Sequence, residues 1–132
     1  MALFLLYSRI DDPVIQYLIE QQFPFVLIGK PHQSTGEVTY IDNDNYLAGR
    51  ELTEYFISLG HKRLAFIGGS PDLMVTKERL AGFKEALKLA DLPMSDDYIV
   101  YMEFFCVKAA SGRWSSFFPW NSLQVLLLLL MI

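Results

Sequence analysis

Short apolar runs alternate with segments of helical spacing along the first hundred residues. The runs at residues 3–7, 25–28, 38–41, 64–67 and 98–102 have the length of strands and are apolar almost throughout, which is typical of parallel strands covered on both faces. Their alternation with helical segments predicts repeated βα units with right-handed crossovers. We therefore expect an α/β fold, with a parallel sheet flanked by helices.

Three segments predict the helices. Asp12 is suited to cap the first helix and Pro13 to occupy its first position. The second helix starts near Tyr46 and stops at Gly60, which we expect to be left-handed. Thr76 is expected to cap the third. The apolar residues that we expect to face inward are Ile15, Leu18 and Ile19 in the first helix, Ala48, Leu52, Tyr55, Phe56 and Leu59 in the second, and Leu80, Phe83, Leu87 and Ala90 in the third.

Composition excludes several classes of function. The net charge of −4 and the absence of a Lys/Arg stripe argue against direct DNA binding by this chain. Its single cysteine, Cys106, excludes an internal disulfide and fits a reducing cytoplasm. The start of the chain has no basic leader, and the apolar run at 125–132 is far shorter than the roughly 20 residues that cross a bilayer. We expect a cytoplasmic chain without a membrane segment.

No residue set predicts catalysis, a metal or a cofactor. His61 follows a helix-ending glycine, His32 lies in a polar loop, and neither has a catalytic partner visible in the sequence. Residues 42–45 have the Asp/Asn spacing of a calcium loop, but Leu47 and Thr53 replace its glycine and closing glutamate. The glycines at 68–69 lack a phosphate-loop lysine. We expect no enzyme activity, no metal and no cofactor.

Three sequence blocks, in order and at matching spacing, carry a resemblance. They are VTYIDNDN at 38–45, AGRELTEYFISLGHKRLAFI at 48–67 and RLAGF at 79–83. Together they resemble the effector domain of LacI/GalR transcriptional repressors, and within that family the chain is most similar to maltose-operon repressors of low-GC Gram-positive bacteria. The resemblance implies an incomplete periplasmic-binding-protein-like fold of type I, and a small-molecule effector, maltose-like, in its cleft.

The resemblance also implies candidate effector-binding residues. Arg79 matches the family arginine that reaches effector hydroxyls, and its planar guanidinium can donate to adjacent oxygens. Ligands of such folds bind at the carboxyl ends of strands, where Tyr7, Ser8, Asp42 and Asn43 lie. Asp42 and Asn43 have an equally good alternative role, which is to end the strand and cap the next helix.

The family pattern further predicts how the chain is divided. Residues 1–104 would form part of the N-subdomain of the effector domain, without the DNA-binding head and without the second subdomain. The parent protein would bind operator DNA as a homodimer. The alternatives are a piece of a periplasmic sugar-transport protein, which the missing leader argues against, and an inert frameshift product.

The segment 105–132 has neither helical nor strand periodicity and ends in an unbroken leucine run, so we expect an irregular, aberrant tail. Codon arithmetic permits a specific explanation. In a frame one nucleotide earlier, the codon at position 121 must encode glutamate and the last codon must encode aspartate. Permitted codons elsewhere give a helix followed by a strand ending in two aspartates, as the family pattern requires. We therefore predict a frameshift beginning near Phe105.

Overall fold

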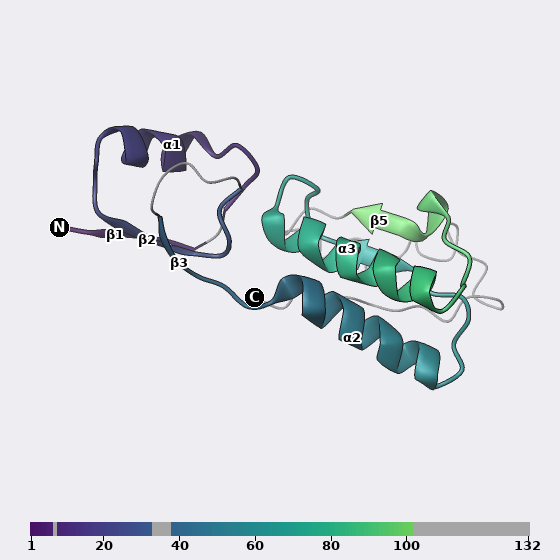
Figure 1. Cartoon of the computed structure of the whole chain (residues 1–132). Helices are drawn as coiled ribbons and strands as arrows, with labels where there is room; N and C mark the ends of the chain where they lie inside the picture. The colour runs from purple at the N-terminus through teal and green to yellow at the C-terminus, as the bar shows by residue number, and fades with distance from the viewer. Residues whose placement is uncertain (7, 33–37, 102–132) are drawn as a thin grey trace, which may run out of the picture.

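The strands form two parallel sheets. The computed structural model describes residues 1–6, 8–32 and 38–101. In the first sheet, β1 (Leu3–Leu5), β2 (Phe25–Ile28) and β3 (Thr39–Ile41) pair in that order, and in the second, β4 (Phe66–Gly68) pairs with β5 (Ile99–Tyr101). The predicted parallel α/β architecture is confirmed. The chain passes once from one sheet to the other, between β3 and β4 (Figure 1).

Helix α1 (Pro13–Glu20) connects β1 to β2 and begins as the sequence predicts. The Asp12 carboxylate accepts a hydrogen bond from the backbone N–H of Val14 at 3.0 Å, and proline occupies the start of the helix. Ile15 and Leu18 are buried, as is Leu27 at the centre of the first sheet. Figure 1 shows α1 lying along the first sheet, and its two buried side chains are among those predicted to face inward.

Helices α2 (Asn45–Ser58) and α3 (Met74–Leu89) pack against each other, and two glycines set how closely (Figure 1). A Cβ atom on Gly49 would overlap the backbone of Arg79, and one on Gly82 would overlap the backbone of Tyr46. The helix backbones therefore touch where side chains would otherwise keep them apart.

The main apolar core lies between α3 and the second sheet. Leu64, Phe66, Phe83 and Leu87 are buried together, and the rings of Phe66 and Phe83 are 5.6 Å apart between centroids. A short 3-10 helix, η1 (Asp96–Tyr98), leads into β5. The expected inward positions at 83 and 87 are confirmed, and this core fixes α3 on the second sheet.

The predicted inward face of the second helix is wrong. The side chains of Leu52, Tyr55 and Leu59 are exposed, whereas Phe56 packs against the core together with Ile57, which was not predicted to face inward. The buried residues of α2 are instead Asn45, Gly49 and Thr53. Small side chains face α3 because the two backbones lie too close for large ones. Larger apolar side chains of α2 such as Leu52 are therefore exposed instead.

The expected cap at Thr76 and the expected inward position at Ala90 are also wrong, whereas the expected left-handed Gly60 is confirmed. Thr76 is a buried residue in the first turn of α3 and not its cap, because the helix begins after Leu73 without a side-chain cap. Ala90 follows the helix end and is exposed. Gly60 has φ of 91°, which is the left-handed conformation predicted at the end of α2.

Candidate functional site

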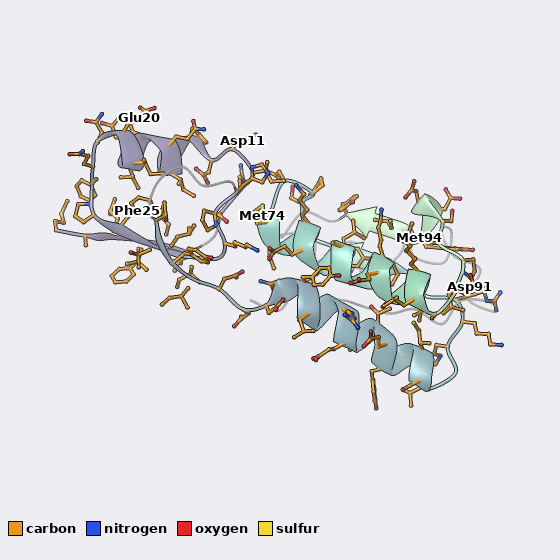
Figure 2. All side chains as sticks on the ribbon, in the orientation of Figure 1. Asp11, Glu20, Phe25, Met74, Asp91 and Met94 are labelled. Carbon is orange, nitrogen blue, oxygen red and sulfur yellow. The ribbon has the colours of Figure 1, made fainter. Side chains whose placement is uncertain are left out.

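The site lies at a seam where the segment that follows β1 meets the segment that precedes α3. The backbone N–H of Ile10 donates to the carbonyl of Asp72 at 2.7 Å, and Arg9 pairs with Leu73 as an antiparallel bridge. Figure 2 shows the two sides of this contact, near Asp11 and Met74. The segment that follows β1 is thereby held beside the start of α3.

A buried serine fixes the loop after β2. The Ser8 hydroxyl, only 4% exposed, donates to the carbonyl of Lys30 at 2.6 Å. Gly29 has φ of 107°, which a residue with a side chain rarely adopts. This turn directs Lys30 toward α3, where its Nζ lies 3.0 Å from Oε1 of Glu78.

A second polar chain connects the end of β3 to α3. Arg79 donates through Nε to Oδ1 of Asn45 at 2.9 Å. Asn45 in turn donates through Nδ2 to Oδ1 of Asp42 and to the carbonyl of Asn43, each at 3.1 Å. Nε is only one of the guanidinium donors, and the side chain carries two terminal amino groups besides it.

The charges at this seam influence one another. Burial raises the pKa of Asp42, and the nearby Glu78 carboxylate raises it further. Burial also lowers the pKa of Arg79, an effect that Asp42 opposes. The hydrogen bond to Glu78 raises the pKa of Lys30. Two cations and two carboxylates therefore share one partly buried region.

Three of the five residues predicted from the sequence come together here. Asp42 and Arg79 are linked through Asn45, and Ser8 supports the neighbouring loop. Asn43 contributes its carbonyl, while the residue is exposed. Tyr7 lies outside the described residues.

Two residues of the site were not predicted. Asn45 belongs to the turn-like run 42–45, in which nothing separates the buried asparagine from its exposed neighbours. Glu78 precedes Arg79, and an acidic residue in the first turns of a helix is usually explained by the helix dipole. Only the contact with Lys30, in the loop after β2, reveals its position.

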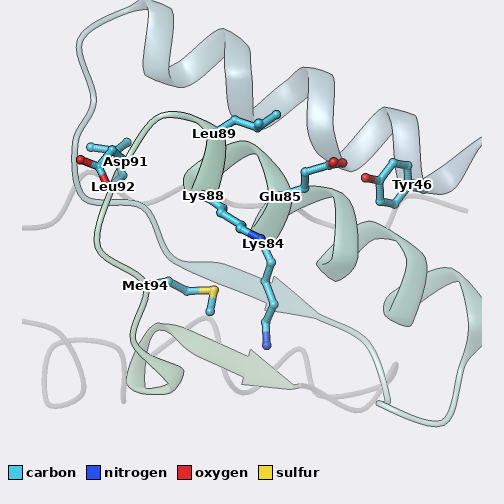
Figure 3. Close-up of a pocket in the computed structure, with 8 residues that line it drawn as sticks. All are labelled: Tyr46, Lys84, Glu85, Lys88, Leu89, Asp91, Leu92 and Met94. Atoms are coloured by element: carbon cyan, nitrogen blue, oxygen red, sulfur yellow. The ribbon is translucent and has the colours of Figure 1, made fainter.

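A separate hollow of about 660 Å³ lies at the other end of α3 (Figure 3). Its lining residues are Tyr46, Lys84, Glu85, Lys88, Leu89, Asp91, Leu92 and Met94. None of the residues predicted to bind an effector lines it. Within the described ranges, no group of three metal-ligating side chains occurs, and no helix is long and apolar enough to cross a membrane.

Parallel α/β units with polar side chains gathered at the ends of their strands define a ligand-binding module. Residues 4–103 match the model of periplasmic binding proteins and the sugar-binding domain of the LacI family. This chain belongs to that family.

Relatives with known names are transcriptional regulators. The HTH-type transcriptional regulator MalR of Streptococcus pneumoniae serotype 4 is 44% identical over 104 residues, which are 79% of this chain and 31% of MalR. A Bacillus cereus subsp. cytotoxis NVH 391-98 chain assigned as a transcriptional regulator LacI is 60% identical, with a TM-score of 0.76, over 78% of this chain and 36% of that chain.

A second similar structure contains a sugar. It is the complex of the transcriptional regulator CelR with cellobiose, which is 38% identical with a TM-score of 0.68 and covers 76% of this chain and 31% of that chain. This chain thus spans about a third of the length of the relatives that it matches.

Proposed function

We propose that this chain is part of the effector-binding domain of a sugar-responsive transcriptional repressor, and that the seam around Arg79 binds the sugar. The observation that carries the proposal is the hydrogen-bonded chain from Arg79 through Asn45 to Asp42. It presents guanidinium donors and carboxylate acceptors on one partly buried surface, which suits the paired hydroxyls of a sugar ring.

The comparisons support a regulator over a transport protein. The named relatives are transcriptional regulators, and one of them is bound to cellobiose. In this proposal residues 1–104 form the effector-binding part, while other parts of the parent protein bind operator DNA. The parent is a cytoplasmic homodimer without enzyme activity, and its effector is a maltose-like glucoside.

Titration calorimetry of the full-length gene product with maltose and cellobiose tests this function. We expect binding of at least one sugar, release of operator DNA at the same concentrations, and affinity about tenfold or more weaker in Arg79→Lys, because lysine lacks the planar fork of donors. Arg63→Lys is the matched control, since Arg63 is exposed and outside the seam. Absence of binding and of operator release with every sugar would reject the function.

A further inference from the structure

Lys30 and Glu78 form an ion pair between the first sheet and α3, one position before Arg79. Their Nζ and Oε1 atoms are 3.0 Å apart. The Lys30 side chain is 51% exposed, whereas that of Glu78 is only 16% exposed. The pair lies beside the sugar-binding surface proposed above, and the alternative role for it is merely to hold the two sheets together.

Four charged side chains of the seam balance one another, while Asp44 acts on Asp42 more weakly and caps α2 by accepting from the backbone N–H of Leu47. Lys30 and Arg79 supply two positive charges, and Asp42 and Glu78 supply two negative charges. These groups are near enough to affect one another, since Glu78 and Lys30 both act on Asp42, and Asp42 acts on Arg79. Each cation therefore already has a carboxylate neighbour before any ligand arrives.

This balance has a consequence for the ligand. An anionic sugar drawn to Lys30 and Arg79 would meet the neighbouring carboxylates of Glu78 and Asp42, and a cationic sugar drawn to those carboxylates would meet the two cations. Both cases bring like charges together in a partly desolvated region, where their repulsion is poorly screened. A neutral polyol can donate to the carboxylates and accept from the cations at the same time.

We propose that Glu78 and Lys30 are selectivity-determining residues that reserve this site for neutral polyhydroxyl ligands by balancing the charges of Arg79 and Asp42 with a second cation and a second carboxylate. The inference rests on the proposed function and names the ligand class of that same site. Selectivity here comes from penalising the wrong ligand as much as from contacts with the right one.

The test compares maltose with three hexoses that differ in charge, namely glucose, glucuronate and glucosamine, by calorimetry on the full-length gene product. Glu78→Gln leaves one excess positive charge and is expected to raise affinity for glucuronate relative to glucose by about tenfold or more. Lys30→Gln leaves one excess negative charge and is expected to raise affinity for glucosamine instead. The double variant restores the balance and is expected to lose both gains.

Glu51→Gln is the matched control, because it removes the same charge from an exposed position on α2. Circular dichroism melts confirm that each variant is folded. If Glu78→Gln does not fold, Lys30→Gln and its effect on glucosamine binding test the inference alone. If maltose binds but neither single variant changes charge preference beyond the control, this inference is wrong and the proposed function stands. If the wild type binds no sugar at all, both are wrong.

Discussion

Arg79 and Asn45 are 34 positions apart in the sequence, and their side chains are joined by a hydrogen bond of 2.9 Å. Asn45 is 4% exposed and also donates to Asp42, so one amide orients both the guanidinium and the carboxylate. The candidate site is thus organised by a side chain that would contact the ligand less than its two neighbours do.

Replacing Asn45 by alanine should lower the free energy of unfolding by about 2 kcal/mol, because partly buried charged groups lose their hydrogen-bond partner. Denaturant unfolding measures the change. Asn43→Ala is the matched control: it stays within about 0.5 kcal/mol because its carbonyl, not its exposed side chain, accepts the bond from Asn45. Equal effects of the two substitutions would contradict an organising role for Asn45.

Gly82→Ala should destabilise the protein by about 1–3 kcal/mol, because its methyl group would meet the backbone of Tyr46 in the neighbouring helix. Gly60→Ala is the control for backbone conformation, because Gly60 is left-handed but has open space around its Cβ position. This substitution should lower the free energy of unfolding by about 1–2 kcal/mol. Thermal unfolding in the presence of sugar distinguishes them further. Only the change at 82, beside α2, should also weaken ligand binding.

Phe83→Ala should cost about 3–5 kcal/mol of unfolding free energy, because it removes a ring buried between Phe66 and Leu87. Leu89→Ala, on the same helix but 65% exposed, should change stability by less than about 0.5 kcal/mol. Chemical denaturation of both variants measures the contrast. Similar losses would mean that α3 does not pack on the second sheet through this face.

The pKa of Asp42 predicts a dependence of stability on pH. Its folded pKa is raised above the ordinary value of 3.8, first by burial and then by Glu78, so the folded state holds a proton that the unfolded state releases. Stability from this group is therefore present at low pH and is lost as pH rises through the folded pKa. Asp42→Asn should remove that loss, which denaturant unfolding from pH 3.5 to 7 measures.

Asp96→Asn is the control for this experiment, because it removes a carboxylate whose side chain is 93% exposed. The stability of Asp42→Asn relative to wild type should increase with pH over the window above 3.8, and more steeply than that of Asp96→Asn. A constant difference between Asp42→Asn and wild type would show that burial of Asp42 does not affect its ionisation.

Sequencing the gene tests the explanation of the tail, all of which lies beyond the described residues. We expect the codons of 107–132, taken one nucleotide earlier, to encode a helix and then a strand that ends in two aspartates. A nucleotide sequence whose shifted frame contains a stop codon, or lacks that pattern, would rule out the frameshift.

The sequence predicts the elements of this fold well and their burial less well. Pro13 and Gly60 mark element ends through backbone conformations that are local properties, and both were placed correctly. The stripe through Leu52 and Tyr55 was misjudged because helical spacing shows only that a helix has an apolar face. Which face packs inward depends on Gly49, whose contact with another helix is not a local property.

The same limit applies to the candidate site. Arg79 and Asp42 stood out because a family motif and a strand end point to them. Asn45 and Glu78 did not, because their importance comes from partners at distant positions. Sequence patterns locate groups that would contact a ligand directly, whereas the residues that hold those groups in place become visible only in three dimensions.

The glycine at position 49 faces the backbone of Arg79, so one interatomic contact both spaces the two helices and sets the reach of the guanidinium. Natural variation should therefore treat 49, 79 and 82 as a linked unit. Homologues with a larger residue at 49 or 82 should therefore also differ in their response to sugar. Exposed positions such as 51 and 88 should vary without that effect.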